Sequence, residues 1–294
     1  MVDKLVSIIT INYNGWKDTC EMIASLKKYE RYPYEVIVVD NASEGNDADL
    51  IEKAFGDVKV IRSDYNLGFA GGNNLGYQYA DGEYIFFLNN DTVVNQPVLQ
   101  VMVQCFEDKS VGGVSPMIRF FHSPDKVQYY GWQKVSHISL RNMTPAYNPA
   151  HPEKYMMGRE IDVMHGAAMM VSRSVIKQVG LMPECYFLYF EEFDWSNCIQ
   201  KSGFKIWYEP AVIIYHKEGT KKGHGLTPFR AYYLERSRVL FARRTLKGFD
   251  RFLSCCYLMG VVLVRDVLKY ILQGRWKMVK AVISGAFSGL TTRM

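Results

Sequence analysis

The first forty residues alternate between two kinds of pattern. Residues 6–11 and 35–40 are short runs rich in β-branched side chains, whereas residues 16–29 between them carry apolar side chains at helical spacing. A strand, a helix and a second strand make a βαβ unit, and its right-handed crossover forces the two strands to be parallel. This feature restricts the chain to the α/β class, in which helices cover a largely parallel sheet.

The same alternation continues along the chain and predicts a doubly wound, mostly parallel sheet in its first third. The predicted elements there are a helix over 47–55, a strand over 58–62, a helix over 73–79 and a strand that ends just before Asp91. Five later runs are expected to extend the same sheet, at 113–120, 161–164, 168–172, 206–208 and 212–216. Two further helices are predicted over 191–202 and 228–246.

Charge is unevenly distributed along the chain. The net charge of +5 combines a balance of −7 in residues 1–216 with a balance of +12 in residues 217–294, where 16 Lys and Arg stand against four Asp and Glu. We therefore predict two parts, residues 1–225 and a basic helical extension over 226–294. Glycines and basic residues between 217 and 227 predict a mobile loop at the boundary.

The basic extension could meet nucleic acid or an anionic membrane surface. Its charge-free run, residues 252–264, is shorter than the roughly 20 apolar residues that span a bilayer, so we expect amphipathic helices on a membrane surface and no nucleic-acid partner. The alternatives are that these helices pack on the first part of the chain or form a homodimer contact. No signal-peptide pattern is present, which favours a cytoplasmic protein held peripherally on the inner face of the cell membrane.

Polar residues follow the ends of the first two predicted strands. Asp40 ends the second strand, while Thr10, Asn12 and Tyr13 lie at the end of the first. Ligands of open α/β sheets bind at the carboxyl ends of strands, so Asp40 could accept a hydrogen bond from the imide N–H of a pyrimidine. The other three would supply polar and stacking contacts. The alternative is that Asp40 caps a helix or a turn.

A glycine-rich segment, residues 65–76, leads into the helix predicted over 73–79. Small residues permit close approach to the backbone, so this segment, with Asn66, Gly68 and Asn73, could cradle an anion. It is neither a Walker loop nor a dinucleotide fingerprint, because the Lys-Ser/Thr pair is missing and the glycine spacing differs. It could equally be only a turn.

An apolar run ends in Asn89, Asn90 and Asp91. One carboxylate and two amides form an oxygen-rich set suited to Mg²⁺ or Mn²⁺, which take their remaining ligands from phosphates and water. We also expect Asn90 to contact the bound nucleotide-sugar. His216, at the end of another predicted strand, could be a further metal ligand. The alternatives are a strand-end cap for Asp91 and a structural role for His216.

Three acids, Glu191, Glu192 and Asp194, open the helix predicted over 191–202. Acids favour the positive end of a helix dipole, which would explain them without any chemistry. The other interpretation is that one glutamate, partly desolvated by the neighbouring aromatic side chains, has a raised pKa suited to a general base.

Taken in order, these segments resemble the inverting family-two glycosyltransferases with a GT-A fold, particularly the rhamnosyltransferase-like branch. The matching segments are 6–14, 38–43, 66–74, 88–92, 165–169, 189–194 and 215–216. The resemblance implies a GT-A type nucleotide-diphospho-sugar transferase fold over residues 1–225, followed by the C-terminal helical extension.

The resemblance also implies roles for the site residues. Asp40 would hold the nucleobase, Asp91 would bind the divalent metal on the donor diphosphate, and the acidic pair would supply the catalytic base. Glu192 occupies the position of the family's catalytic Asp, and Glu191 directly precedes it.

Two positions depart from the family pattern. Asn89 replaces the first acid of the Asp-X-Asp motif, so metal binding rests more on Asp91. Cys198 stands where many relatives carry Arg, which puts a substrate or phosphate contact there in doubt.

The implied activity is transfer of a sugar, with inversion, to a hydroxyl of a glycan or lipid-linked acceptor in cell-surface polysaccharide synthesis. The favoured donor is dTDP-rhamnose, and the alternative is a UDP-hexose or UDP-N-acetylhexosamine. The rival classes are a non-catalytic nucleotide-sugar binding protein and a nucleotidyltransferase. The intact acidic motif argues against the first, and the lack of a basic glycine-rich loop near the amino terminus argues against the second.

Overall fold

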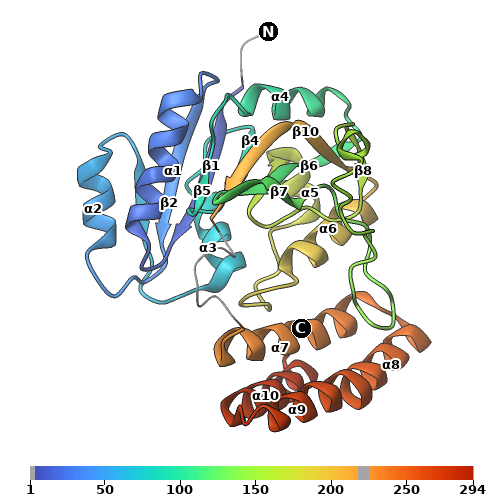
Figure 1. Ribbon diagram of the computed structural model, residues 1–294. Coiled ribbons are helices and arrows are strands. Elements are labelled where there is room, and N and C mark those ends of the chain that lie inside the picture. The colour runs from blue at the N-terminus through green and yellow to red at the C-terminus, as the bar shows by residue number, and fades with distance from the viewer. Residues whose placement is uncertain (1–3, 218–225, 294) are drawn as a thin grey trace.

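One mixed sheet forms the centre of the molecule (Figure 1). The computed structural model describes residues 4–217 and 226–293, and ten strands of this part join the sheet. The mobile loop predicted over 217–227 lies almost wholly outside the described residues. The strands are β1 (Val6–Asn12), β2 (Tyr34–Asp40), β3 (Lys59–Arg62), β4 (Tyr84–Leu88), β5 (Thr92–Val93), β6 (Val111–Phe120), β7 (Ser123–Tyr129), β8 (Arg159–Ile161), β9 (Ala168–Ser172) and β10 (Lys205–His216).

The sheet has a parallel half and a mixed half. Its order is β3-β2-β1-β4-β9-β6-β10-β5, with β7 beside β6 and β8 beside β10. The first four strands in this order are parallel, as the βαβ pattern predicts, whereas β9 runs antiparallel to both β4 and β6. The predicted strands at 206–208 and 212–216 are one long strand, β10, whose pairing with β6 shifts register between Glu209 and Ile213.

Helices pack around the sheet and at the carboxyl-terminal end of the chain. They are α1 (Trp16–Tyr29), α2 (Asp47–Ala54), α3 (Gly68–Tyr77), α4 (Leu99–Gln104), α5 (Arg173–Val179), α6 (Glu191–Lys201), α7 (Pro228–Thr245), α8 (Gly248–Tyr257), α9 (Leu263–Leu272) and α10 (Trp276–Thr291). Short 3₁₀ turns occupy Cys105–Glu107 and Pro152–Tyr155, and a π-helical segment, Leu258–Val262, joins α8 to α9.

The glycine-rich segment is helical, so the prediction of a loop before residue 73 is wrong. The helix α3 begins at Gly68. Its glycines are needed because α3 lies directly on the sheet: a Cβ at Gly76 would lie 2.5 Å from Ile9 Cγ2, and one at Gly72 would lie 2.9 Å from Ile11 Cδ1. Glycines suggest a turn when only the sequence is considered, but here their lack of side chains lets the helix pack closely on the strands.

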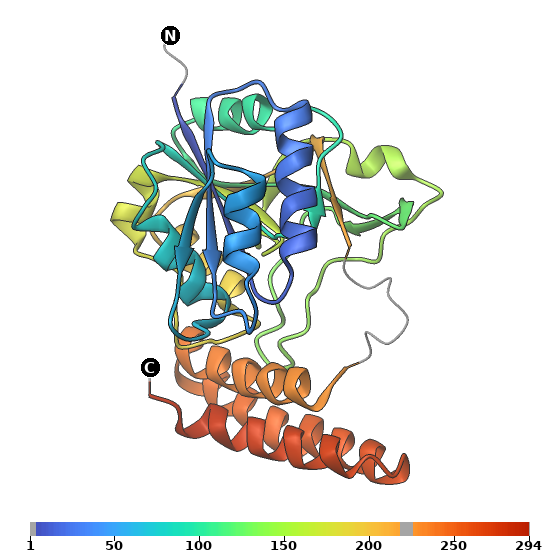
Figure 2. The same ribbon diagram turned by 90° about the vertical axis from the view of Figure 1, so that its left-hand side faces the viewer.

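The helix α7 lies between the sheet-containing part and the remaining helices of the extension (Figures 1 and 2). Its Ser237 and Arg236 donate hydrogen bonds to backbone carbonyls of Leu188 and Cys185, and Arg244 forms a 2.7 Å ion pair with the buried Asp194 of α6. On its other side α7 packs against α10. The first helix of the extension is therefore packed on the rest of the chain, one of the alternatives open from the sequence.

Candidate active site

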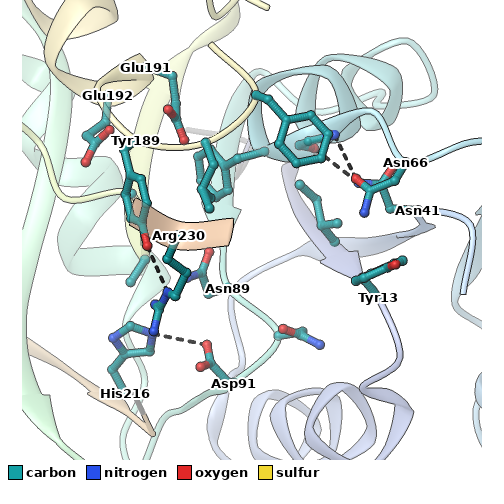
Figure 3. A pocket seen from close by; sticks show the side chains of 18 of the residues that line it. Tyr13, Asn41, Asn66, Asn89, Asp91, Tyr189, Glu191, Glu192, His216 and Arg230 are labelled. Atoms are coloured by element: carbon teal, nitrogen blue, oxygen red, sulfur yellow. Dashed lines mark hydrogen bonds and ion pairs between the residues drawn. The ribbon is translucent and has the colours of Figure 1, made fainter. Parts of the chain in front are cut away.

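A cavity of about 790 Å³ opens at the carboxyl ends of the parallel strands (Figure 3). The residues directly after β1, β2 and β4 line it, namely Tyr13, Asn41 and Asn89. Figure 3 shows Glu191 and Glu192 on one side of the cavity, Tyr13, Asn41 and Asn66 on another, and Asp91 beside His216 on a third. The cavity thus lies where open α/β sheets bind their ligands.

Asp91 and His216 meet in this cavity. The last residue of β10 pairs antiparallel with Thr92, and this places His216 Nε2 3.1 Å from Asp91 Oδ1. Burial raises the pKa of Asp91, but the hydrogen bond and charge of His216 outweigh it, so the pKa is lowered overall. The other ring nitrogen, Nδ1, lies 2.9 Å from Oε1 of Gln128. The ring can carry its proton on Nε2, donated to Asp91, or on Nδ1, donated to Gln128, and the second tautomer would let Nε2 bind a cation together with the carboxylate.

This pair fits a divalent cation that takes most of its ligands from elsewhere. In the tautomer with the proton on Nδ1, Nε2 and Asp91 Oδ1 are two acceptor atoms 3.1 Å apart that a cation would hold together, and the residues that the structure describes contain no cluster of three His, Cys, Asp or Glu side chains suited to a metal. A carboxylate oxygen with an imidazole nitrogen suits Mn²⁺ better than Mg²⁺, which prefers oxygen alone. The remaining positions would fall to a ligand such as a diphosphate and to water.

Glu191 and Glu192 are adjacent in sequence but have different surroundings. Tyr189 and Phe190 both have positive φ angles, of 69° and 73°, and this sharp turn starts α6 at the cavity wall. Glu191 is only 3% exposed, and its Oε2 makes no hydrogen bond with any residue described in the structure. Burial, followed by the neighbouring charge of Glu192, raises the pKa of Glu191 well above its ordinary value. Glu192 is half-buried and also lines the cavity.

Asp40 lies in a buried hydrogen-bond network and does not line the cavity. Its Oδ1 accepts hydrogen bonds from Asn12 Nδ2 and Ser43 Oγ, at 2.9 and 2.5 Å, and Asn12 also donates to Asp47. Thr10 is fully buried as well. Of the four residues predicted at these strand ends, Tyr13 is brought to the cavity, whereas Thr10, Asn12 and Asp40 are behind its wall. The turn-capping alternative describes this arrangement of Asp40, and its contact with a nucleobase stays a prediction.

The glycine-rich segment contributes two of its three predicted residues. Asn66 and Gly68 line the cavity, whereas Asn73 is buried and donates a hydrogen bond to the carbonyl of Phe69. The N–H of Gly68 donates to Asn66 Oδ1, and that of Phe69 donates to the carbonyl of Phe187. These two amides at the start of α3 are therefore already bonded within the chain, contrary to the predicted anion cradle. Asn90 lines the cavity, as predicted for a ligand contact.

Several cavity residues escaped sequence reasoning. Phe229 and Arg230 come from the first turn of α7, where Thr227 accepts a hydrogen bond from the N–H of Arg230 and Pro228 takes the first helical position. Arg230 Nε donates a 2.8 Å hydrogen bond to the hydroxyl of Tyr189. In the sequence these residues belong to the basic extension, where a positive charge is as typical of a membrane surface as of a ligand site.

Lys217 is a second cation at the cavity that the sequence did not single out. It directly follows His216, is buried, and lies within 2.6 Å of Asp18 and 2.7 Å of Glu21. Burial lowers the pKa of Lys217, but hydrogen bonds to these two carboxylates outweigh it and raise the pKa overall. This side chain therefore stays positively charged beside Asp91.

Comparison with known proteins agrees with this geometry. Residues 7–180 match the family described as Glycosyl transferase family 2. A hexosyltransferase of low-salt glycan biosynthesis from Haloferax volcanii is 24% identical over the whole chain and 93% of its own length. The N-acetylglucosaminyl-diphospho-decaprenol L-rhamnosyltransferase of Mycobacterium tuberculosis is 20% identical, covering 82% of this chain and 85% of its own. A dTDP-rhamnosyl transferase of Shigella flexneri is 26% identical, covering 80% and 79%.

Solved structures show the same fold. A mannosyltransferase from Pyrobaculum calidifontis, in complex with GDP-Man and Mn²⁺, superposes with a TM-score of 0.61 at 17% identity, over all of this chain and 89% of its own. GalNAc-T7 with UDP, GalNAc and Mn²⁺ gives a TM-score of 0.62 at 16% identity, over 91% of this chain and 58% of its own. The predicted GT-A type fold with C-terminal helices is confirmed. The family match spans more than half of the sequence, and the chain belongs to glycosyl transferase family 2.

Proposed function

We propose that this glycosyltransferase transfers a sugar from a nucleoside diphosphate donor to an acceptor hydroxyl with inversion at the anomeric carbon. The observation that carries the proposal is that Asp91 with His216, and Glu191 with Glu192, line one cavity although they come from distant parts of the chain. A pair of residues suited to a cation, two adjacent glutamates and a cavity of about 790 Å³ match what binding and transfer of a diphosphate-activated sugar require.

In this proposal the donor lies along the carboxyl ends of β1, β2 and β4. Tyr13 and Asn66 would contact the nucleoside, with Asp40 behind them, and Asp91 and His216 would hold Mn²⁺ or Mg²⁺ beside the diphosphate. The cation, when bound, offsets negative charge that develops on the leaving diphosphate. Arg230 and Lys217 also line this cavity, where the charge of Lys217 is balanced by Asp18 and Glu21.

Glu192 is the proposed general base, and Glu191 supports it. A base must be ionised, and burial together with the neighbouring charge favours the neutral form of Glu191. The half-buried Glu192 would take the proton of the acceptor hydroxyl as its oxygen attacks the anomeric carbon and the bond to the diphosphate breaks. A neutral Glu191 would donate a hydrogen bond to a sugar hydroxyl from its otherwise unbonded Oε2.

The proposed donor is dTDP-rhamnose, since two of the relatives are rhamnosyltransferases. A UDP-hexose or UDP-N-acetylhexosamine is the alternative donor. The proposed acceptor is a glycan or a lipid-linked sugar, because the mycobacterial relative is an N-acetylglucosaminyl-diphospho-decaprenol L-rhamnosyltransferase.

The proposed site of action is the inner face of the cell membrane. Within residues 4–217 and 226–293, no helix combines the length and the apolar character needed to cross a bilayer. The helices α8 to α10 nevertheless expose large apolar side chains, among them Phe249, Phe252, Leu272 and Trp276. Apolar side chains combined with the excess of basic residues in this region support peripheral docking on anionic lipid, and a contact between two copies of the chain is the alternative.

Nucleoside diphosphate release across a panel of donors, with and without EDTA, tests the proposal. We expect release with dTDP-rhamnose that EDTA abolishes, and we expect Glu192→Gln to lower transfer by about 10²- to 10⁴-fold without weakening dTDP binding. Glu153→Gln, at an exposed glutamate, is the matched control. Normal turnover by the Glu192→Gln variant would show that the base is assigned wrongly.

A further inference from the structure

A second cavity, of about 480 Å³, adjoins the first one. The two cavities share Tyr189 and Glu192 as lining residues. The carboxylate proposed as general base therefore stands at their junction, where it can reach a molecule on either side.

The wall of the second cavity is largely aromatic. Trp132 stacks on Phe193 with ring centroids 5.7 Å apart and an angle of 23° between the rings, and Tyr130 lies on the same wall. Trp132 is half-buried, so part of its indole remains accessible from the cavity. The part of the indole that Phe193 does not cover can pack against the C–H face of a pyranose ring.

Polar groups complete the lining of this cavity. Gln128, Asn142 and Thr144 contribute amide and hydroxyl groups that can hydrogen-bond sugar hydroxyls. Gln128 also lies 2.9 Å from His216, which ties the second cavity to the proposed cation site. The side chains of Asn142 and Thr144 each accept one hydrogen bond from the backbone, and their N–H and O–H groups can donate to a hydroxylated ligand but not to an aliphatic chain.

The loop that carries Asn142 and Thr144 is attached to the helical extension. Ser254 of α8 donates a hydrogen bond to the carbonyl of Ile138, and His137 lies 3.1 Å from Asp250 of α8. Leu234 of α7 lines the cavity itself. A ligand in this cavity therefore lies beside α7, and the loop that contributes Asn142 and Thr144 to the cavity also contacts α8.

We propose that the second cavity is the acceptor subsite and binds a pyranose ring of a glycan or glycolipid through Trp132. The proposal rests on the function proposed above. The acceptor hydroxyl oxygen forms a bond to the anomeric carbon of the donor sugar while the bond from that carbon to the diphosphate breaks. The bonding electron pair leaves with the diphosphate, and the hydroxyl proton passes to Glu192.

Saturation-transfer NMR with p-nitrophenyl hexopyranosides and N-acetylhexosaminides tests the subsite without any turnover. The probes are added to the full chain in the presence of dTDP. We expect pyranose ring protons to receive saturation from the wild-type protein. This saturation-transfer signal should be at least fivefold weaker with Trp132→Ala, whereas Trp132→Phe should keep most of it. Trp207→Ala is the matched control, because Trp207 of β10 lines a different cavity.

Kinetics provide the second measurement. Trp132→Ala should raise the KM for the best glycoside at least tenfold and change the dissociation constant of dTDP less than twofold. Wild-type binding by Trp132→Ala, or a wild-type protein that binds none of the glycosides, would overturn the proposal. Glycoside binding that depends on Trp132, without nucleoside diphosphate release from any donor, would contradict the proposed function and leave the subsite standing.

Discussion

Two adjacent glutamates illustrate how environment separates chemical roles at the scale of single residues. Glu191 faces inward at the start of α6, is almost fully buried, and has an oxygen without a partner among the described residues. Glu192, one position further along the helix, lies at the junction of two cavities. The sequence places both acids in one helical turn, and burial of Glu191 favours its neutral form.

Glu191→Gln should change how stability depends on pH. A carboxyl whose pKa is higher in the folded than in the unfolded protein holds more protons when folded, so stability falls as pH rises above the unfolded value of 4.5. A glutamine cannot ionise, so the variant lacks this fall in stability with rising pH. We expect the melting temperature of the variant, relative to the wild type, to increase steadily from about pH 5 to pH 8.

Thermal unfolding followed by circular dichroism across this pH range measures the effect. Glu160→Gln is the control, because Glu160 is exposed and should give a curve parallel to the wild type. Parallel curves for Glu191→Gln and the wild type would contradict the raised pKa.

The sequence predicts a cavity residue correctly where its position at the end of a strand is enough to bring it to the cavity. Asp91, His216 and Tyr13 follow or end strands, and the strand ends bring them to the cavity. Asp40 also ends a strand, yet Asn12 and Ser43 hold its carboxylate behind the cavity wall. Strand position indicates an edge of the sheet, but side-chain hydrogen bonds decide whether the group reaches the ligand.

At the scale of elements, α3 shows why a helix was partly missed. Its first half is rich in glycine and lacks the apolar periodicity by which the sequence predicts helices. The helix forms because its glycines let it lie close to β1, a tertiary contact with no local signal. The helix α1, which carries a clear apolar stripe, lies over the predicted residues 16–29.

Gly76→Ala tests this close packing. A Cβ there would lie 2.5 Å from Ile9 Cγ2 and 3.1 Å from Val39 Cγ2, so α3 must move away from the sheet. We expect a loss of about 1–3 kcal/mol in the free energy of unfolding, as is usual for overpacked cores. The loss should exceed the gain in helix propensity that alanine brings.

Urea-induced unfolding measures the difference, and Gly260→Ala is the matched control. Gly260 is exposed in the π-helical segment, and nothing lies within 4 Å of its added Cβ. This control should be neutral or stabilising by up to about 1 kcal/mol. Equal stability of Gly76→Ala and the wild type would show that α3 can shift without cost.

At the scale of the whole molecule, the extension has two functions in this proposal. The charge count separates it from the rest of the chain, but it cannot show that α7 supplies Phe229 and Arg230 to the cavity or that Arg244 reaches Asp194. A long amphipathic helix presents different residues to different neighbours, and only the folded arrangement assigns each face. The proposed membrane surface therefore belongs to α8, α9 and α10, while α7 completes the active site.

The double variant Leu272→Ser, Trp276→Ser tests the proposed membrane surface. These side chains are 88% and 66% exposed at the turn between α9 and α10, and the exposed Lys269, Arg275 and Lys277 lie beside them in sequence. Each large apolar side chain contributes about 1.5–3 kcal/mol when fully buried. We therefore expect the variant to bind vesicles of phosphatidylcholine and phosphatidylglycerol at least tenfold more weakly than the wild type.

Cosedimentation of the full chain with these vesicles measures binding, and Met157→Ser is the control. Met157 is 72% exposed in the loop before β8, away from the extension in sequence, so its replacement should leave binding unchanged. Wild-type binding should also weaken on raising the salt from 0.1 M to 1 M, because the screening length falls from about 10 Å to about 3 Å. A wild-type protein that stays in the supernatant, or a double variant that sediments as well as the wild type, would reject the membrane surface. If the wild type forms a dimer in solution and the double variant does not, these side chains belong instead to a contact between two copies of the chain.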